Sequence, residues 1–360
     1  MRVLNVDLKD TKYNIYVGAG IFSNIHDILN SLDVSNDVFI ITDENVGRLY
    51  LDKCLSYLRD YKVNYFMIKP GEKSKNLEVA KEIYKKMLIS RCDRQTTVVS
   101  LGGGVVGDIA GFVASTYMRG IDFIQVPTTL LAQVDSSVGG KVAVNFDSYK
   151  NIIGAFYQPR TVIIDVNFLE TLSKRDFFSG LGEVVKYGLI KNYDFFNWLR
   201  NNFKKIIQLD KECLVNIIME SLKIKRDVVE IDERDKGIRR ILNFGHTIGH
   251  GIESLDNFNR YKHGEAVALG IVYESFISKK LDMIDEKYFK EITDMVSKIV
   301  ELKAFNDKEI KEIMKKMEHD KKKINNKNVF VLPIGKGKVD IFTETDKKVI
   351  IKSLKDGVKL

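Results

Sequence analysis

The chain has few cysteines and lacks long apolar segments. Its 360 residues include three cysteines, Cys54, Cys92 and Cys213, which stand far apart. This spacing argues against a disulfide framework and a cysteine-bound zinc site, and it favours a reducing compartment. No apolar run reaches the roughly 18 residues of a membrane helix, and Met1–Asp7 alternates like a strand instead of forming an apolar signal region. We therefore expect a cytoplasmic protein with no membrane partner.

Acidic residues are outnumbered by basic ones, but the excess is modest. Lys and Arg total 57 against 49 Asp and Glu, which gives a net charge of +8. The excess is spread along the chain, apart from local clusters such as Lys321–Lys323. The sequence has no zinc-finger, homeodomain or RNA-recognition signature, so we expect no nucleic-acid partner. A mild positive balance suits a phosphorylated small molecule, although solvation alone accounts for most of these lysines.

The periodicity of apolar residues divides the chain into two parts, and its length suits two domains with separate cores. Up to about residue 170, strand-like and helix-like segments alternate, which is typical of a parallel sheet covered by helices. After Ser173 the helical period dominates. The sequence therefore predicts an α/β, Rossmann-like domain over residues 1–172 and a mostly α-helical domain over residues 173–360. The expected strands are Val38–Thr42, Val63–Ile68, Thr97–Leu101, Phe123–Val126, Val162–Ile164 and Val329–Pro333. The expected helices are Asn76–Ser90, Leu181–Ile190, Tyr193–Leu209, Lys211–Val229, Thr247–Leu255, Gly264–Lys280, Glu286–Val300 and Asp307–Lys316.

A glycine-rich turn follows one of the expected strands. Gly102, Gly104 and Gly107 fit the G-x-G-x-x-G spacing between that strand and a helix. Such glycines let the backbone approach a pyrophosphate, and the helix N-terminus supplies backbone N–H groups. The match is short, so an ordinary tight strand-to-helix turn is the alternative. Asp43 and the turn Pro70–Lys75 place further polar groups at strand ends, where α/β sheets bind ligands.

Three of the five histidines are close in sequence, at positions 246, 250 and 263. His246 and His250 are four apart and would share one helix face, and His263 follows a loop-like insert. Glu183 and Lys186 are three apart in an apolar helical segment that also contains glycines. A carboxylate with two imidazoles is a common catalytic zinc set with one position open for substrate. The alternatives are an ordinary Glu183–Lys186 ion pair and three histidines without a shared role.

A second dense segment, Val126–Lys141, is expected to form a strand end, a helix and a glycine turn. Asp135 and Lys141 stand there among small and apolar residues. Buried charges are costly unless they are paired or used, so both are candidates for a functional site. Lys150 and Asn151 follow shortly afterwards, before another apolar run.

Together, these segments closely resemble the 3-dehydroquinate synthase family of sugar-phosphate cyclases. The resemblance runs from about Asp43 to Gly335. Its specific pieces are Pro70-Gly71-Glu72 with Lys75, Gly102–Asp108, Arg119-Gly120, Pro127–Lys141, Lys150-Asn151, Gly182–Lys186, Asp232-Glu233, Gly237–His250 and His263-Gly264-Glu265. The resemblance implies NAD, a zinc or cobalt ion, and 3-deoxy-D-arabino-heptulosonate 7-phosphate as substrate. It also implies a reaction in which NAD oxidises the substrate transiently, phosphate is eliminated, the hydride returns, and ring opening precedes aldol closure to 3-dehydroquinate.

The resemblance also assigns roles to residues of this chain. The implied metal ligands are Glu183, His246 and His263, so that His250 would lie near the substrate instead. The implied NAD contacts are Asp43, Glu72, Lys75, Gly104, Val105, Val106, Gly107, Asp108, Thr128, Thr129, Lys141, Lys150, Phe168, Leu169, Glu170 and Thr171. The implied substrate contacts are Arg119, Asp135, Lys141, Lys150, Asn151, Lys186, Lys225, Arg239, Asn243, His250 and either Lys321 or Lys322. The implied catalytic residues are Asp135, Lys141, Glu183, Lys186 and His250. Arg119 resembles an arginine that reaches the neighbouring subunit's substrate, which implies a homodimer.

Three rival functions fit parts of the sequence. The nearest is a sister cyclase that makes 2-deoxy-scyllo-inosose or 2-epi-5-epi-valiolone. The spacing of Arg239, Asn243, His246 and His250, with Lys225 upstream, favours a substrate with a carboxylate to be held. A glycerol-type metal-dependent dehydrogenase would release NADH and tends to use Asp with histidines. A non-catalytic module that binds a sugar phosphate or nucleic acid would not need Glu183, His246 and His263 together.

Overall fold

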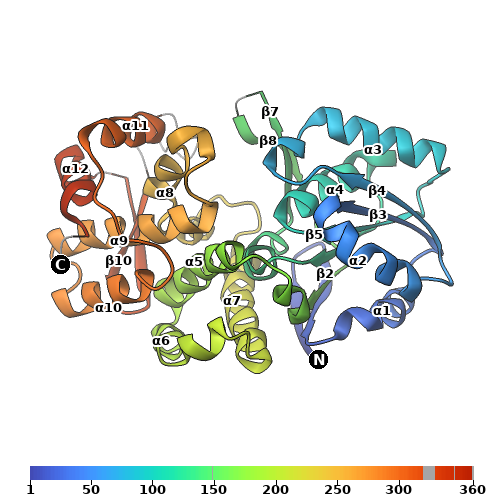
Figure 1. Ribbon diagram of the computed structural model, residues 1–360, viewed down its shortest axis with the longest axis horizontal. Helices are drawn as coiled ribbons and strands as arrows, with labels where there is room; N and C mark the ends of the chain where they lie inside the picture. The colour runs from blue at the N-terminus through green and yellow to red at the C-terminus, as the bar shows by residue number, and fades with distance from the viewer. Residues whose placement is uncertain (148, 319–328, 344, 359–360) are drawn as a thin grey trace. The chain divides into compact units, whose positions relative to one another are not determined.

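The computed structural model describes residues 1–147, 149–318, 329–343 and 345–358, and the chain forms two compact units (Figure 1). Unit 1 comprises Met1–Leu172 and Leu209–Arg234, and unit 2 comprises Ser173–Gln208 and Asp235–Leu360. The sequence predicts a mostly α-helical domain over residues 173–360. The segment 209–234 differs from that expectation because its helix, α7 (Lys211–Ile231), packs against strands β1 and β2 of unit 1. The domain boundaries themselves stay a prediction.

Unit 1 is built on a mostly parallel sheet. In the part of the chain that the structure describes, the sheet has seven strands in the order β1-β2-β9-β6-β5-β3-β4. All neighbouring pairs are parallel except β1 and β2, which form an antiparallel hairpin. The strands are β1 (Arg2–Asp7), β2 (Lys12–Gly18), β3 (Asp37–Asp43), β4 (Lys62–Ile68), β5 (Thr97–Gly102), β6 (Phe123–Pro127) and β9 (Thr161–Asp165). Every residue of β5, β6 and β9 is buried, as expected for central parallel strands covered on both faces.

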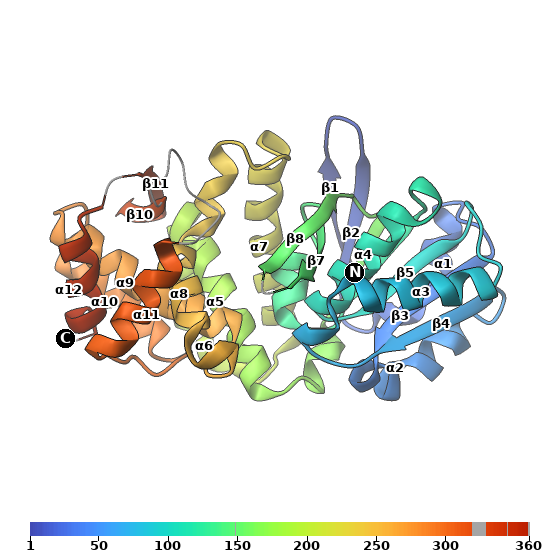
Figure 2. The ribbon, with the colours of Figure 1, turned by 90° about the horizontal axis from the view of Figure 1, so that it is seen from above.

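Helices cover both faces of the sheet of unit 1 (Figures 1 and 2), and the side chains of the central strands alternate between these two layers. On β3, Phe39 and Ile41 join an apolar cluster with α3, α4 and β7, whereas Val38 and Ile40 join the cluster with α1 and α2. This alternation is the period of two that a strand imposes. The helices and helical turns of unit 1 are η1 (Ile21–Asn24), α1 (Ile25–Ser31), α2 (Glu44–Tyr57), η2 (Glu72–Ser74), α3 (Leu77–Ile89), α4 (Gly104–Thr116), η3 (Tyr117–Arg119), the π-helical η4 (Ala132–Ser136), η5 (Val166–Glu170) and α7. A separate hairpin consists of β7 (Lys141–Phe146) and β8 (Tyr149–Phe156).

Unit 2 is mainly helical and is organised around α9 (His263–Lys280). Fourteen residues of α9 are buried, and the helix packs against α5, α8, α10, α12 and strand β10. A helix that is apolar on all sides is expected at the centre of such a unit. The remaining elements are α5 (Lys174–Lys191), α6 (Tyr193–Ile207), η6 (Ile238–Asn243), α8 (His246–Glu253), η7 (Leu255–Phe258), α10 (Glu286–Val296), α11 (Asp307–Glu318), β10 (Phe330–Gly335), β11 (Lys338–Phe342) and α12 (Lys347–Asp356).

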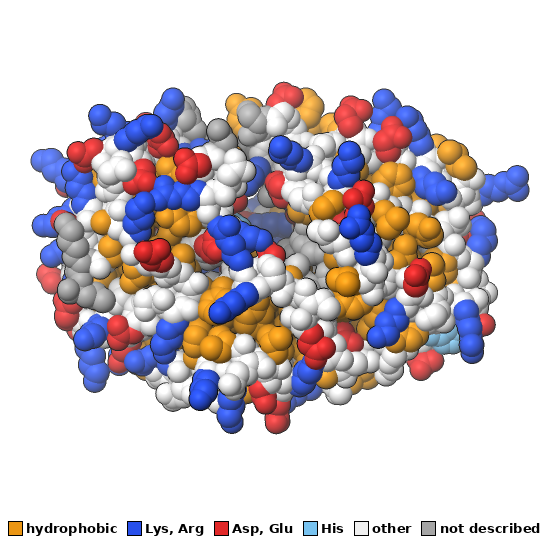
Figure 3. Space-filling view, viewed as in Figure 1, with side chains coloured by type: hydrophobic (Ala, Val, Ile, Leu, Met, Phe, Trp, Pro, Cys, Tyr) orange, Lys and Arg blue, Asp and Glu red, His pale blue; other side chains and the backbone are white. Residues whose placement is uncertain are grey.

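The predicted fold class, an α/β domain followed by a mostly helical part, is confirmed. The expected strands and helices correspond to observed elements, and most ends shift by a few residues, although α5 begins seven residues before the expected Leu181. The hairpin β7–β8, strand β11 and helix α12 were not predicted. Among the described residues, none of the helices combines the length and apolar character needed to cross a membrane. Lys and Arg side chains are scattered over the face in view in Figure 3 and do not gather in one basic patch there.

Candidate metal site and nucleotide-binding turn

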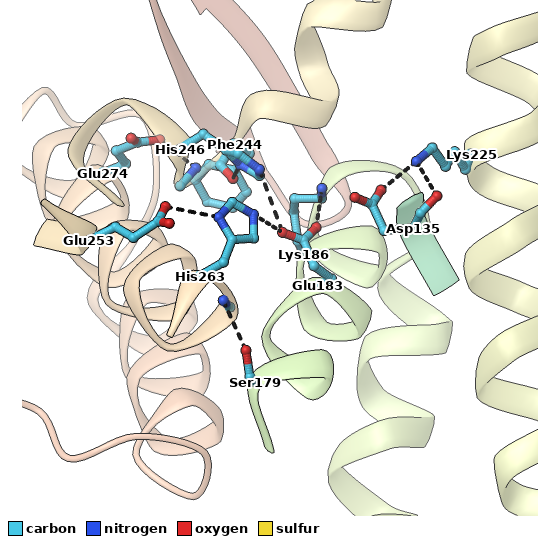
Figure 4. A network of polar contacts seen from close by, with 12 residues as sticks. Asp135, Ser179, Glu183, Lys186, Lys225, Phe244, His246, Glu253, His263 and Glu274 are labelled. Carbon is cyan, nitrogen blue, oxygen red and sulfur yellow. Dashed lines mark hydrogen bonds and ion pairs between the residues drawn. The ribbon is translucent and has the colours of Figure 1, made fainter. Parts of the chain in front are cut away.

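Three helices of unit 2 bring Glu183, His246 and His263 together (Figure 4). Glu183 lies in the middle of α5 and is fully buried, whereas His246 and His263 are the first residues of α8 and α9. One ligand atom from each residue can be chosen so that all three lie within 4.8 Å of one another. The Nε2 atoms of both histidines lie 3.5 Å from Oε1 of Glu183. One carboxylate and two imidazoles therefore converge as a zinc site requires.

Hydrogen bonds at the opposite ring nitrogens orient both imidazoles. Nδ1 of His246 lies 3.2 Å from the carbonyl oxygen of Phe244, and Nδ1 of His263 lies 3.1 Å from Oε2 of Glu253. A carbonyl oxygen and a carboxylate oxygen accept hydrogen bonds, so Nδ1 carries the proton in a neutral ring. The lone pair of each Nε2 is then available to a metal on the side of Glu183. Metal-ligating histidines usually donate their other ring N–H to a carboxylate or carbonyl oxygen in this way.

Close backbone contacts fix α5 against α9. The main-chain N–H of Gly264 donates to Oγ of Ser179 over 3.1 Å. A Cβ atom added at Gly264 would lie 1.8 Å from the carbonyl oxygen of Ser179, and one added at Gly182 would lie 2.3 Å from the carbonyl oxygen of Gly264. Both glycines are therefore required for close approach of the two helices. Each stands next to a candidate ligand, Glu183 or His263, so the packing sets the separation between those ligands.

Lys186 forms the predicted i,i+3 ion pair with Oε2 of Glu183. Its side chain is 1% exposed, and its ammonium group lies 4.8 Å from the centre of the Tyr187 ring. The ion pair considered as the alternative therefore forms, but both of its members are buried. Burying such a pair is costly relative to apolar residues of similar size, which is consistent with a functional reason for keeping it.

His250 lies beside these ligands and belongs to a second possible donor group. Its ring centre lies 5.4 Å from that of His246, and His250, Glu253 and His263 also offer ligand atoms within 4.8 Å of one another. The geometry favours the group with Glu183, because Glu253 already accepts the hydrogen bond from His263 and therefore supports a ligand. Sequence spacing places His246 and His250 on one helix face but does not decide which histidines would ligate a metal.

The surrounding carboxylates change the pKa of His263. Burial lowers the pKa of this imidazole, but hydrogen bonds to Glu183 and Glu253, together with their negative charges, outweigh burial and raise it to about 10. In the metal-free protein, both ring nitrogens of His263 are therefore protonated at neutral pH, and the second proton is on Nε2. A metal ion must displace that proton before it can bind Nε2.

In unit 1, the glycine-rich turn joins β5 to α4. Gly103 is the N-cap of α4, and the helix begins at Gly104. A Cβ atom at Gly103 would lie 3.0 Å from Cγ2 of Thr129, and one at Gly104 would lie 3.1 Å from Oγ of Ser136. The turn thus sits at the carboxyl end of a parallel strand, directly before a helix N-terminus, where α/β folds bind pyrophosphate. The predicted residues Val105, Val106, Gly107 and Asp108 form the first turns of α4.

A polar network connects the turn after β4 with α4 and the β7–β8 hairpin. The ammonium group of Lys75 bonds to Asp108 and to Oδ1 of Asn151. Burial raises the pKa of Asp108, and the charge and hydrogen bond of Lys75 oppose that rise. Asn145 donates to Oε1 of Glu72 over 2.8 Å and accepts from the main-chain N–H of Asn151 over 2.9 Å. Asn145 was missed from the sequence, because nothing there indicates that its strand pairs with β8.

Lys225 and Asp135, both in unit 1, form a second connection across a long sequence separation. Nζ of Lys225 lies 2.6 Å from Oδ1 and 2.6 Å from the main-chain oxygen of Asp135. The side chain of Lys225 is 7% exposed, so the pair is shielded from water. Two residues expected to contact the substrate are therefore neighbours, and α7 holds the lysine in place.

The remaining predicted residues occupy varied positions. Asp43 caps α2 by accepting from the main-chain N–H groups of Asn45 and Val46. In η5, Phe168 and Leu169 are buried, Glu170 pairs with Lys211, and Thr171 hydrogen-bonds to Tyr50. The other positions are Thr128 after β6, Lys141 on β7, Lys150 on β8, Arg119 at the end of η3, and Arg239 and Asn243 on η6. Lys321 and Lys322 lie outside the described residues. These NAD and substrate assignments stay predictions.

Comparisons with known proteins agree over most of the chain. The family models described as 3-dehydroquinate synthase N-terminal and 3-dehydroquinate synthase C-terminal match residues 65–179 and 180–323. The 3-dehydroquinate synthase of Thermoanaerobacter sp. (strain X514) is 46% identical over 352 residues, which cover 97% of this chain and 99% of that protein.

Solved structures share the fold. A crystal structure of 2-deoxy-scyllo-inosose synthase complexed with carbaglucose-6-phosphate, NAD+ and Co2+ has a TM-score of 0.86 and 25% identity, and the match covers 99% of this chain and 100% of that one. The 2-epi-5-epi-valiolone synthase from Streptomyces hygroscopicus subsp. jinggangensis 5008, with NAD+ and Zn2+ bound, has a TM-score of 0.84 and 24% identity, with 98% of each chain covered. From the family matches and the full-length sequence similarity, we conclude that the chain belongs to the 3-dehydroquinate synthase family.

Proposed function

We propose that this chain converts 3-deoxy-D-arabino-heptulosonate 7-phosphate to 3-dehydroquinate and inorganic phosphate, with NAD and one zinc or cobalt ion. Family membership over nearly the whole chain supports the reaction. The observation that carries the proposal is the convergence of Glu183 with the Nε2 atoms of His246 and His263. The related 2-deoxy-scyllo-inosose synthase binds NAD+ and Co2+ together, which supports both cofactors.

In this proposal, Glu183, His246 and His263 hold the metal. When bound, the metal supplies Lewis-acid activation of a substrate hydroxyl, and NAD supplies reversible hydride transfer. Hydrogen bonds from Nδ1 to Phe244 and Glu253 keep both imidazoles in the ligating tautomer. Lys186 neutralises part of the charge that Glu183 brings into the buried site.

His250 acts as an acid–base group near the substrate and is not a metal ligand. Its ring is adjacent to His246 and partly accessible, and an imidazole can donate or accept a proton. Among the residues proposed to bind the anionic substrate, Lys186 and Arg239 of unit 2 are both buried. Cations in shielded surroundings bind phosphate and carboxylate oxygens more strongly than exposed ones. Of the unit 1 residues proposed for the substrate, Lys225 is likewise shielded and is held by Asp135.

NAD binds at the turn between β5 and α4. Gly103 and Gly104 have no side chains to block the approach of a pyrophosphate, and a Cβ atom at either position would crowd a neighbouring side chain. The position of this turn directly before α4 also supports a pyrophosphate contact. Glu72 and Lys75 lie on the adjacent turn, and Lys75 is linked directly to Asp108. These groups supply both hydrogen-bond donors and acceptors for the nucleotide.

The chain acts as a homodimer in the cytoplasm, with Arg119 reaching the partner's substrate. Met118 and Arg119 are exposed, with φ angles of 50° and 70°. Non-glycine residues seldom adopt positive φ, and consecutive examples are expected where a turn has a function. Co-expression of Arg119→Ala with His263→Ala tests the assignment, because one active site in each mixed dimer would be complete. Partial recovery of activity is expected; mixed dimers as inactive as either variant alone would contradict it.

The three cysteines are free and buried, which is consistent with a reducing compartment.

The proposed reaction is tested by phosphate release from 3-deoxy-D-arabino-heptulosonate 7-phosphate, measured with NAD present in a smaller molar amount than this substrate. Many phosphates should be released per NAD, a chelator should stop release, and zinc should restore it. Net accumulation of NADH with a simple polyol would instead indicate a dehydrogenase.

The second candidate is a sister cyclase, favoured by the TM-score of 0.86 to 2-deoxy-scyllo-inosose synthase. Phosphate release from a hexose 6-phosphate, with none from the carboxylated substrate, would establish that alternative.

A further inference from the structure

A buried carboxylate in the middle of α9 faces the start of α8 (Figure 4). Glu274 is fully buried. Its Oε2 accepts a hydrogen bond from the main-chain N–H of Gly245 over 2.7 Å, and its Oε1 accepts one from the main-chain N–H of Ile248 over 3.1 Å. Both oxygens of one carboxylate therefore serve the first turn of a helix that is distant in sequence.

The first turn of α8 needs such a partner because its own N-cap has no side chain. That N-cap is Gly245, whose φ of 79° places it in the left-handed region. A helix leaves its first N–H groups without intrahelical acceptors, and a capping box normally supplies acceptors to the N-cap and N3 positions. Gly245 and Ile248 occupy these two positions, so Glu274 provides both acceptors of a capping box from another helix. Its negative charge also suits the positive end of the α8 dipole.

Backbone packing holds the same two helices in register. A Cβ atom at Gly270 would lie 1.9 Å from the carbonyl oxygen of Gly245, and one at Gly245 would lie 2.7 Å from the carbonyl oxygen of Val267. Glu274 follows Gly270 by one helical turn, so its side chain extends along the same face toward α8. The start of α8 is consequently fixed by close contact on one side and by two hydrogen bonds from Glu274.

Two residues, the candidate ligand His246 and Thr247, lie between the two bonded N–H groups, and α9 itself begins with His263. We propose that Glu274 is a positioning residue for the metal site: it fixes the backbone that carries His246 relative to the helix that carries His263. This inference rests on the proposed metal-binding function of these two histidines. Glu274 contacts the backbone of α8 and would touch neither the metal nor the substrate.

The test variant is Glu274→Gln, which keeps the shape of the side chain but replaces one acceptor by an NH2 donor. Ser275→Ala is the matched control, since Ser275 is the next residue of α9 and is equally buried. Three properties would be measured: the zinc dissociation constant by chelator competition, the visible spectrum of the cobalt-substituted protein, and amide hydrogen exchange at Gly245 and Ile248 in the metal-free protein.

Glu274→Gln should weaken zinc binding by about 10- to 100-fold, the usual effect of losing support for a ligand. It should also shift the cobalt spectrum and speed amide exchange at both positions, whereas Ser275→Ala should match the wild-type protein in all three. A folded Glu274→Gln protein with unchanged zinc affinity and cobalt spectrum would overturn the inference. If Glu274→Gln does not fold, Glu274→Asp tests the same point, because it keeps the charge and withdraws it by one methylene. Wild-type protein that binds no zinc would instead overturn the proposed function, and this inference with it.

Discussion

The proposed metal-ligand group of unit 2 and the proposed nucleotide-binding turn of unit 1 would recognise their ligands in different ways. The first uses side chains, Glu183, His246 and His263, whose positions depend on three helices and on hydrogen bonds at the far ring nitrogens. The second uses backbone, and it depends on side chains that are missing at Gly103 and Gly104. One region should therefore fail when atoms are removed, and the other when atoms are added. The predictions below use this difference, beginning with the largest effect.

Replacement of His263 by Ala should abolish stable zinc binding and lower turnover by at least about 10³-fold. The variant loses one of three ligands. Losing the several kcal/mol of Lewis-acid stabilisation that the metal supplies would lower the rate by about this factor. NAD binding should remain, because the glycine-rich turn belongs to unit 1. Zinc content by elemental analysis and NAD titration would be measured on the same preparation.

His26→Ala is the matched control, because His26 lies on α1 beside exposed acidic groups and outside the ligand group. Its zinc content and turnover should equal those of the wild-type protein. Near-normal zinc in His263→Ala would remove this residue from the ligand set.

Replacement of His250 by Ala should keep zinc and lower the turnover number by about 10² to 10⁴, the range for loss of an acid–base group. The variant discriminates the two donor groups, since only the group with Glu253 includes His250. Parallel measurement of zinc content and rate decides the matter. Loss of zinc together with activity would show that the second donor group holds the metal.

The sequence predicted the residue types of the metal group but not their geometry. Spacing placed His246 and His250 on one helix face, and the choice of His263 as a ligand came from family resemblance. The supporting contacts of Phe244 and Glu253 depend on tertiary packing and have no spacing that would indicate them. The same applies to Glu274, whose sequence position resembles that of an ordinary helical residue.

The fold was more predictable where apolar residues form a clear pattern along the sequence. The central strands are continuous apolar runs, so their expected ranges fall within β3, β5, β6 and β9. The hairpin β7–β8 was missed because β8 has no fully buried residue and therefore no clear apolar face. Pairing between Lys225 and Asp135 across 90 residues was also beyond local pattern, and it accompanies the grouping of α7 with unit 1.

Zinc affinity should increase with pH, by about tenfold per pH unit between pH 7 and 9. Hydrogen bonds and charges from Glu183 and Glu253 overcome burial and raise the pKa of His263 to about 10, so one proton must leave for each metal ion bound. Chelator-buffered titrations at several pH values, with proton release followed in weak buffer, measure this. Affinity that is independent of pH over this interval would contradict protonation of His263 in the metal-free state.

Stability of the metal-free protein should follow the opposite trend. A raised pKa means that the folded state holds the proton more tightly than the unfolded chain. The stabilisation from His263 is therefore complete below about pH 6.5 and disappears as pH rises through about 10. Urea unfolding of the metal-free wild-type protein should show this loss relative to His263→Gln. A constant difference between the two proteins from pH 6 to 10 would argue against the proposed charge state.

Replacement of Gly104 by Ala should have the smallest effect and should act on the nucleotide alone. The added Cβ atom would lie 3.1 Å from Oγ of Ser136, and crowding of about 1–2 kcal/mol corresponds to roughly tenfold weaker NAD binding. Zinc affinity should not change, because every candidate metal ligand is a side chain of unit 2. Gly335→Ala is the control, since a Cβ atom there meets nothing within 4 Å. If Gly104→Ala bound NAD as tightly as the control while losing zinc, the division between a backbone site for nucleotide and a side-chain site for metal would be wrong; weaker NAD binding with normal zinc would support it.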